Sequence, residues 1–282
     1  MKISIVHAGL FKLDGGAMFG VVPKQLWNRL NPADENNMCT WAMRCLLIET
    51  DDRKILVDTG MGHKQDEKFK KHFEPHGPYD LIQSLADHDL KPGEITDVFL
   101  THFHFDHVGG ALVKDGNNIV PQFPNATYWS NELHWEWALN ANDREAASFL
   151  KENIVGLKEH GVIEFIDVVQ DITWIKNIGV KFFYGHTEAM MTPIITLNNG
   201  KQYAYAADLM PSSYHIRMPY VMSYDIRPLD TLNEKKEFLE FAMENDIYII
   251  FEHDPIYECG KVAKDDQQRF YFSELKMLSE TL

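Results

Sequence analysis

Three histidines and an aspartate lie within six residues of one another in the segment Thr101–Gly110. Imidazole and carboxylate groups are the side chains that bind Zn²⁺ and similar divalent cations. In an extended segment, His102, His104 and Asp106 point to the same side of the chain. His107 points elsewhere unless the chain turns at that position. The spacing therefore predicts two groups of ligands, and with them two divalent metal ions.

The residues that flank this segment argue against the alternative of a histidine-rich surface loop. Val98–Leu100 is a short apolar run of the kind found in buried strands, and it leads directly into the segment. Gly109 and Gly110 follow it and allow a sharp turn or the close approach of a neighbouring element. A solvated loop needs neither feature, so we interpret the segment as a metal site.

The segment resembles the His-x-His-x-Asp-His signature of the metallo-β-lactamase superfamily, and the resemblance extends along most of the chain. Four further segments occur in the order that the superfamily shows. Leu56–Gly60, with an Asp-Thr-Gly turn, precedes the metal segment, and it is followed by Gly185–Thr187 with Gly-His, Ala206–Asp208 with a strand-end aspartate, and Phe251–Pro255 with a final histidine. Together these segments are specific for the superfamily, although not for one substrate.

By matching position, the resemblance implies two divalent metal ions, with zinc expected and manganese, cobalt and iron as alternatives. The implied ligands are His102, His104 and His186 for one metal, Asp106, His107 and His253 for the other, and Asp208 as the bridge between them. Asp58 would accept the N–H of a ligand imidazole and fix its orientation. Taken alone, His186 could be a core histidine, Asp208 a helix N-cap and His253 a strand-end residue. Their joint order favours the ligand interpretation.

The resemblance also implies a hydrolase in which a metal-bound hydroxide attacks a carbonyl or phosphoryl centre. Asp106 would orient this nucleophile and shuttle its proton, and Asp208 would hold the metals that polarise the substrate oxygen. The sequence contains no Gly-x-Ser-x-Gly segment that would supply a serine nucleophile instead.

Two stretches, Phe19–Trp27 and Asp208–Asp225, resemble the quorum-quenching branch that hydrolyses N-acyl homoserine lactones, which is similar in turn to methyl-parathion-type hydrolases. Their methionine and aromatic side chains suit an apolar slot for an acyl chain. The candidate pocket residues are Phe19, Trp27, Met210, Tyr214, Tyr220 and Met222. For each one, the alternative is core packing or a dimer contact. Pro211 departs from the branch, because some lactonases carry there a tyrosine that binds the substrate carbonyl.

We therefore expect a zinc-dependent hydrolase of the lactonase or esterase type, acting on N-acyl homoserine lactones or related lactones and esters. An organophosphate hydrolase and a glyoxalase II-type thioesterase are the alternatives within the hydrolases. An iron-dependent redox enzyme on the same fold, and a non-catalytic binding module with a structural metal, are the alternatives from other classes.

The elements that must position these residues alternate between strand and helix patterns, which predicts an α/β or α+β architecture. The resemblance implies the four-layer αβ/βα sandwich of the superfamily. The expected elements include a hairpin of Ala42–Glu49 with Lys54–Val57, helices over Ser130–Leu139 and Asp143–Leu157, and a helix from Asp230 or Thr231 to Glu244. Glu234 is placed for a capping box at the start of the last helix.

Composition restricts the partners and the location. The 282 residues include 27 lysines and arginines against 42 aspartates and glutamates, a formal charge of −15. Such an acidic surface disfavours nucleic acid and anionic membranes as partners. No apolar run reaches the length of a signal peptide or a membrane span, so we expect a cytoplasmic protein. We expect residues 1–282 to form one domain with a helical insertion around residues 130–160. Residues 14–37 are rich in Gly, Pro, Asn and Asp, which predicts a long loop, and this loop favours a homodimer.

Overall fold

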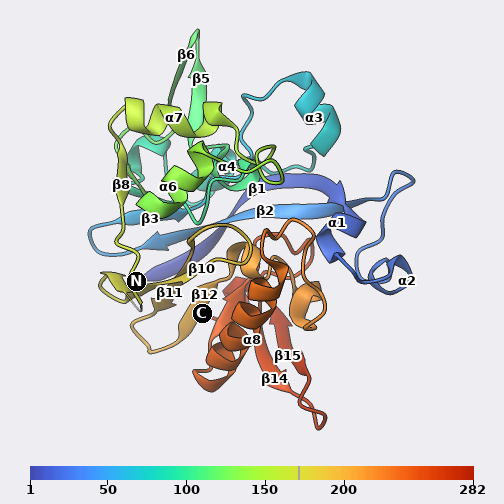
Figure 1. Ribbon diagram of the computed structural model, residues 1–282. Helices are drawn as coiled ribbons and strands as arrows, with labels where there is room; N and C mark the ends of the chain where they lie inside the picture. The colour runs from blue at the N-terminus through green and yellow to red at the C-terminus, as the bar shows by residue number, and fades with distance from the viewer. Residues whose placement is uncertain (171) are drawn as a thin grey trace. The chain divides into compact units, whose positions relative to one another are not determined.

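The computed structural model describes residues 1–170 and 172–282, and the chain forms two compact units. The first unit comprises residues 1–10 and 43–169, and the second comprises residues 11–42 and 170–282. Both units combine strands with helices, so the predicted α/β class is confirmed (Figure 1). The expectation of a single domain stays a prediction.

The first unit is built on a six-stranded sheet with the strand order β1-β2-β3-β4-β7-β8. Its strands are β1 (Lys2–Asp14), β2 (Met38–Glu49), β3 (Lys54–Val57), β4 (Asp97–Phe99), β7 (Thr127–Ser130) and β8 (Ile163–Phe165). Residues 11–14 of β1 and 38–42 of β2 are grouped with the second unit. A separate hairpin pairs β5 (Leu112–Asp115) with β6 (Asn118–Pro121). The helices are α3 (Glu67–Phe73), α4 (Leu81–Ala86), α5 (Phe105–Val108), α6 (Glu132–Leu139) and α7 (Lys151–Glu159).

One hydrophobic core joins the helices of the first unit to its sheet. Leu85 of α4, Trp135 of α6 and Leu157 of α7 are buried together with Val98 of β4 and Tyr128 of β7. Burying a large apolar side chain contributes roughly 1.5–3 kcal/mol, so this core holds the sheet firmly in place. Strands β3, β4, β7 and β8 run parallel. The loops that follow β3 and β4 therefore leave the sheet at the same edge.

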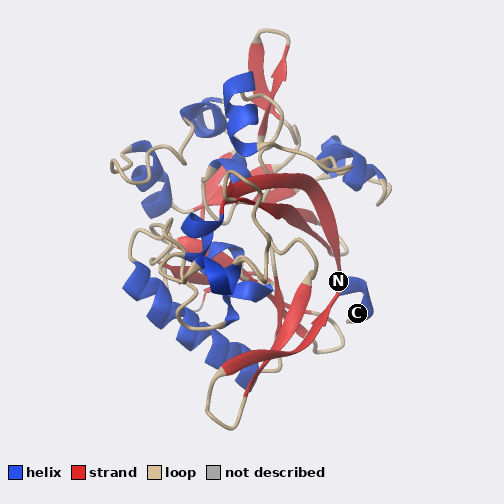
Figure 2. Cartoon of the chain, turned by 90° about the vertical axis from the view of Figure 1, so that its right-hand side faces the viewer, coloured by secondary structure: helices blue, strands red, loops and turns tan. Residues whose placement is uncertain are grey.

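The second unit is built on a seven-stranded sheet with the order β15-β14-β13-β12-β11-β10-β9. Its strands are β9 (Ile172–Ile175), β10 (Ile178–Phe183), β11 (Met190–Thr196), β12 (Gln202–Tyr205), β13 (Tyr248–Ile250), β14 (Cys259–Lys264) and β15 (Phe270–Lys276). The helices are α1 (Gly15–Phe19), α2 (Lys24–Trp27) and the long α8 (Pro228–Glu244), which is prominent in Figure 2. Phe238 of α8 packs edge-on against Phe183 of β10, with ring centroids 5.7 Å apart.

Strand direction in the second unit brings three chain segments to one edge. Strand β12 pairs with β13 in parallel. Strand β11 is antiparallel to both β10 and β12, so β10 and β12 run in the same direction. The carboxyl ends of β10, β12 and β13 therefore lie at the same edge of the sheet, where ligands commonly bind in α/β proteins.

The predicted hairpin is confirmed, with Leu46 opposite Val57 and Glu49 opposite Lys54. The prediction of a helix over Asp143–Leu157 is wrong in its first half. Residues 143–148 form turns, and α7 begins only at Lys151. The side chain of Asn142 accepts hydrogen bonds from the N–H groups of Arg144 and Glu145, which favours a turn over a continuous helix.

The predicted start of the last helix is also wrong. Helix α8 begins at Pro228, and proline suits a first turn because its missing N–H would have no helical partner there. Glu234 does not form a capping box. Its carboxylate accepts hydrogen bonds from the N–H groups of Tyr184 and Gly185 instead.

Two short helices, α1 and α2, lie within the segment 14–37 that was expected to be a loop. None of the helices in the described part of the chain is both long and apolar enough to cross a membrane.

Candidate functional site

The predicted metal segment lies at the carboxyl end of β4 in the first unit, and all four of its candidate ligands are buried. Residues 100–104 have no regular secondary structure, and the chain then enters the four-residue helix α5, which contains Asp106 and His107. This helical turn brings His107 back beside His102, with ring centroids 3.9 Å apart. His102 Nε2 lies 3.0 Å from His104 Nδ1. The first unit thus gathers the whole segment into one cluster.

Each imidazole of this cluster has its other ring nitrogen beside an oxygen atom. His104 Nε2 lies 3.0 Å from a carboxylate oxygen of Glu145, and His107 Nδ1 lies 3.1 Å from Asp58. His102 Nδ1 lies 3.0 Å from the hydroxyl of Thr101. These oxygens accept the ring N–H, and so the opposite nitrogens, His102 Nε2 and His104 Nδ1, face each other with lone pairs. Two buried lone pairs at this distance suit a shared cation.

Asp58 organises this edge of the first unit. Its carboxylate accepts hydrogen bonds from the N–H and the hydroxyl of Thr101, at 2.8 and 2.7 Å, besides its contact with His107. The loop that follows Asp58 lies directly on the two glycines of the metal segment. A Cβ atom on Gly109 would lie 2.0 Å from the carbonyl oxygen of Met61, and one on Gly110 would lie 2.2 Å from that of Thr59. Only glycine permits this close approach.

The second unit brings together His186, Asp208 and His253, which follow β10, β12 and β13 at the shared edge. The two carboxylate oxygens of Asp208 face different imidazoles. Oδ2 lies 3.1 Å from His186 Nε2, and Oδ1 lies 3.2 Å from His253 Nε2. This arrangement suits a carboxylate that bridges two cations.

The imidazoles of the second unit are oriented in the same way as those of the first. His186 Nδ1 lies 2.8 Å from Asp225, and His253 Nδ1 lies 2.7 Å from the carbonyl oxygen of Ala42. Burial lowers the pKa of His186, but the carboxylates of Asp208 and Asp225 outweigh burial and raise it to about 10. The surroundings of His186 therefore favour positive charge. In both units, the buried imidazole and carboxylate donors fit divalent cations.

Sequence reasoning named Asp58 for this role but missed two other carboxylates that hold these imidazoles, Glu145 and Asp225. Glu145 is 41 residues from His104, and Asp225 is 39 residues from His186. Neither has a local sequence signal, because tertiary structure alone brings each pair together. Glu145 is fixed further by the indole N–H of Trp137, which donates to it at 2.7 Å.

The predicted pocket residues of the second unit form a buried aromatic cluster. Phe19 stacks on Trp27 with ring centroids 5.3 Å apart, and on His215 at 5.1 Å. Tyr220 meets Phe19 edge-on at 6.0 Å. Met210 and Met222 are buried, whereas Tyr214 is half-buried with its ring edge-on to Trp41. The structure brings Phe19, Trp27 and Tyr220 together, and a role in substrate binding stays a prediction.

A cavity of about 950 Å³ in the first unit was not predicted from the sequence. Three phenylalanines line it together with five lysines. These are Phe69, Phe73 and Phe149, and Lys64, Lys68, Lys71, Lys114 and Lys151. The ring of Phe73 lies 4.4 Å from that of Phe105 in the metal segment, and Phe149 lies 4.9 Å from the ring of His104. Phe69 and Phe73 are four residues apart on α3, a spacing that the sequence offered as a signal. The cavity therefore shares its aromatic wall with the metal segment.

The family model of the metallo-beta-lactamase superfamily matches residues 44–253. A probable metal-dependent hydrolase from Staphylococcus aureus has a similar structure, with a TM-score of 0.88 and 26% identity over 98% of this chain and 96% of its own. AidC, a dizinc quorum-quenching lactonase solved with the product N-hexanoyl-L-homoserine, gives a TM-score of 0.78 and 22% identity over 96% and 92% of the two chains. The hydrolase AbOPH of the beta-lactamase superfamily gives a TM-score of 0.77 and 19% identity over 98% of this chain and 94% of its own. The similarity to AidC and AbOPH shows that this chain shares their fold.

Proposed function

The chain belongs to the metallo-beta-lactamase superfamily, and on that premise we propose that it opens N-acyl homoserine lactones or related lactones and esters. The family match and the similar structures support a metal-dependent hydrolase of this superfamily, whose histidine and aspartate clusters bind divalent metal ions. Its specific substrate and metal are the parts that we propose.

The proposed metal ligands are the seven residues that match the family pattern. His102, His104 and His186 hold one ion, Asp106, His107 and His253 hold the other, Asp208 bridges them, and zinc is the proposed metal. Support comes from each unit separately. In both, every candidate imidazole has one ring nitrogen beside an oxygen and so offers the other to a cation.

Two bound divalent ions would supply the acidity that activates a water molecule and the positive charge that polarises the scissile carbonyl. The protein's own residues control where this chemistry happens. Asp106 orients the attacking water and holds its proton until the leaving oxygen needs it. Asp58, Glu145 and Asp225 fix the imidazole rings, and the burial of the cluster excludes bulk water.

The single observation that carries the substrate proposal is the cavity of the first unit, which three phenylalanines and five lysines line. Its wall includes Phe149, which contacts His104, and its volume of about 950 Å³ suits an acyl chain or a similar apolar group. A lactone or ester with an apolar substituent could place its carbonyl at the metal ligands and its substituent against Phe69 and Phe73.

Phosphotriester hydrolysis is the second candidate, and Pro211 favours it. The proline has no hydroxyl at the position where some lactonases use a tyrosine to bind the substrate carbonyl. The hydrolase AbOPH has a similar fold.

A substrate panel on the metal-loaded protein tests the proposal. We expect turnover of short- and long-chain N-acyl homoserine lactones after loading with zinc, manganese or cobalt, and loss of activity on chelation. Asp106→Asn should lower kcat by about 10²–10⁴-fold, the usual contribution of a positioned acid–base group. Asp115→Asn, which changes an exposed aspartate on β5, is the matched control.

Failure on all lactones together with efficient phosphotriester turnover would transfer the assignment to the second candidate. Less than about one metal ion per chain, with hydrolysis unaffected by chelation, would contradict the metal-dependent mechanism itself.

A further inference from the structure

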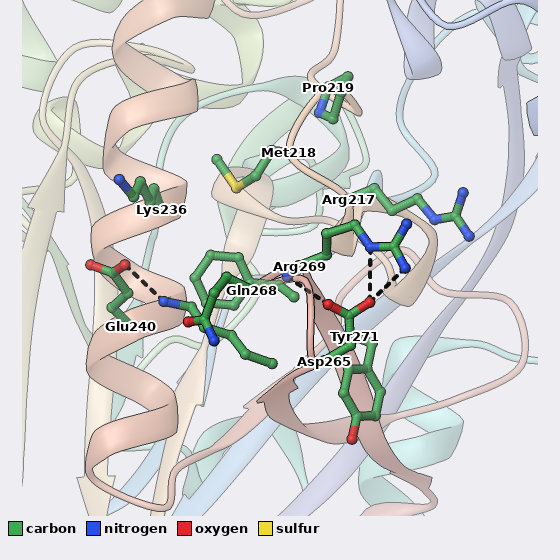
Figure 3. Close-up of a pocket in the computed structure, with 11 residues that line it drawn as sticks. Arg217, Met218, Pro219, Lys236, Glu240, Asp265, Gln268, Arg269 and Tyr271 are labelled. Carbon is green, nitrogen blue, oxygen red and sulfur yellow. Dashed lines mark hydrogen bonds and ion pairs between the residues drawn. The ribbon is translucent and has the colours of Figure 1, made fainter.

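We propose that a second pocket, in the second unit, binds a small organic anion with an apolar body. The pocket has a volume of about 560 Å³, within the range of small-molecule sites, and none of the candidate metal ligands lines it. It lies between the chain that follows His215, the helix α8 and the hairpin β14–β15 (Figure 3). Nothing in the proposed hydrolysis requires it.

The first wall of this pocket is fastened to α8 by a buried lysine. Lys235 is 1% exposed, and its ammonium group lies within hydrogen-bond distance of four carbonyl oxygens, those of His215, Arg217, Met218 and Tyr220. Its three N–H groups are shared among these acceptors. The neighbouring Lys236 and Glu240 stand on the side of α8 that lines the pocket. The backbone that carries Arg217 and Met218 is thus held in a fixed position before any ligand arrives.

The hairpin wall is held by ion pairs. Lys264 of β14 contacts Glu240 of α8 at 3.1 Å, and Arg269 contacts Asp265 within the hairpin at 2.7 Å. Lys264 also lies over the ring of Phe270, 4.6 Å from its centroid. These contacts use up both carboxylates that line the pocket.

Two cations remain without a counter-charge. In the described part of the chain, the guanidinium of Arg217 and the ammonium of Lys236 have no hydrogen-bond or ion-pair partner, and no dashed line reaches either group in Figure 3. Four basic and two acidic side chains line the pocket, so it carries positive charge in a protein whose formal charge is −15. A carboxylate or a phosphate monoester would neutralise this charge with charge-assisted hydrogen bonds.

The rest of the lining selects for an apolar body on that anion. Met218, Pro219, Phe270 and Tyr271 contribute apolar surface beside the cations. Methionine and aromatic side chains adapt to ligands of varied shape. The combination matches an amphiphilic anion, whereas inorganic phosphate or acetate would leave the apolar surface unused.

Calorimetry on the metal-loaded protein tests separately the need for an anionic head group and the need for an apolar body. The ligands compared are octanoate, octanamide, which has no charge, and acetate, which has no long apolar chain. We expect saturable octanoate binding, with octanamide and acetate weaker by about tenfold or more. Octyl phosphate, run as a further probe, distinguishes a phosphate ester from a carboxylate as the preferred head group.

The variant R217Q/K236Q should weaken octanoate binding by about tenfold or more. The variant R29Q/K176Q removes one exposed arginine and one exposed lysine elsewhere in the second unit, and it should bind normally.

Carbon-13 labelling of the methionine methyl groups locates the ligand. The Met218 methyl signal should shift on titration with octanoate, while that of Met277, which does not line the pocket, should not. Octanoate bound instead by the metal ions would leave Met218 unchanged and would bind R217Q/K236Q as tightly as the wild type. Either result, or the absence of saturable binding, would overturn the proposal.

Discussion

At the residue scale, a buried imidazole held by an oxygen atom recurs at every candidate metal position. Four kinds of acceptor serve this purpose: the Thr101 hydroxyl, the carboxylates of aspartate and of glutamate, and the backbone carbonyl of Ala42. Holding one nitrogen fixes the tautomer and the direction of the other, which raises the affinity of a histidine for a metal ion. The geometry of the candidate site therefore depends on residues that bind no metal themselves.

Glu145→Gln tests this dependence in the first unit. The amide offers an NH₂ group or a weaker acceptor to His104 Nε2, so the tautomer of the ring is no longer enforced. We expect metal affinity or kcat to fall by about 10–100-fold, with unchanged far-ultraviolet circular dichroism. Metal content after equilibration with a competing chelator provides the measurement. Glu136→Gln, on the exposed side of α6, should leave that content unchanged.

His215, which is not a proposed metal ligand, provides a pH-dependent prediction. Burial, the largest effect, and the nearby Lys235 ammonium lower the pKa of His215 to about 3. The neutral ring is already satisfied, because Nε2 donates to the carbonyl of Met18 and Nδ1 accepts from the Ser212 hydroxyl. Between the ordinary pKa of 6.5 and about 3, the unfolded chain binds this proton and the folded chain does not. Stability is therefore lost as the pH falls through this range.

We expect the free energy of unfolding of the wild type to decline by up to about 1.4 kcal/mol per pH unit more steeply than that of His215→Gln in this window. Urea unfolding at a series of pH values gives both slopes. His160→Gln, which removes an exposed histidine, should retain the wild-type slope. Equal slopes for the wild type and His215→Gln would contradict the assignment of a neutral His215.

At the scale of elements, helix α8 connects several parts of the second unit. Its Glu234 binds the N–H groups of Tyr184 and Gly185 just before His186, and its Lys235 binds the segment 215–220. A Cβ on Gly185 would lie only 2.2 Å from the backbone nitrogen of Thr231, so the helix also packs directly against that turn. The position of His186 thus depends on the first turns of α8.

Lys235→Met should destabilise the protein by about 2–4 kcal/mol, because it leaves carbonyl oxygens buried without a donor. Lys236→Met is the matched control on the next residue of the same helix. Lys236 is exposed, and its replacement should change stability by no more than about 0.5 kcal/mol. Chemical denaturation measures both variants, and hydrogen exchange over residues 213–220 should accelerate only in the first. Similar stability of the two variants would contradict a clamping role for Lys235.

Local patterns predicted some elements and missed others for physical reasons. The hairpin of β2 and β3 and the helix α6 follow from hydrophobic periodicity, which acts over neighbouring residues. The start of α8 and the turns before α7 do not, because Glu234 and Glu145 are engaged by distant parts of the chain. The metal segment was predictable because its residues are adjacent in sequence. The carboxylates that orient them are not adjacent, and the cavity beside Phe149 is formed by segments far apart in the chain.

At the scale of the whole molecule, exposed apolar side chains gather in one stretch of the second unit. Val21 is 88% exposed, and Leu26 and Leu30 are also exposed, on and around α2. Three exposed apolar side chains within ten residues of the chain are consistent with a protein interface. It agrees with the homodimer expected from the long segment 14–37, which we retain as a prediction.

Light scattering coupled to size-exclusion chromatography should give twice the mass of one chain for the wild type. The double variant V21D/L26D should give the monomer, because burying two carboxylates at an interface is unfavourable. Leu229→Asp changes another exposed leucine, on α8, and should not alter the mass. A wild-type monomer at micromolar concentration would remove the homodimer from consideration.

The two units interleave along the chain, since residues 1–10 and 43–169 form one and residues 11–42 and 170–282 form the other. No single break in the coding sequence separates them. A ribosome that has finished residue 169 has completed one unit but only the first 32 residues of the other. Genetic exchange that joined one half of this gene to a foreign half would give each product an incomplete unit. We therefore expect recombination within this gene to be disfavoured. Sequence variation among related proteins should then arise through point substitutions and loop insertions.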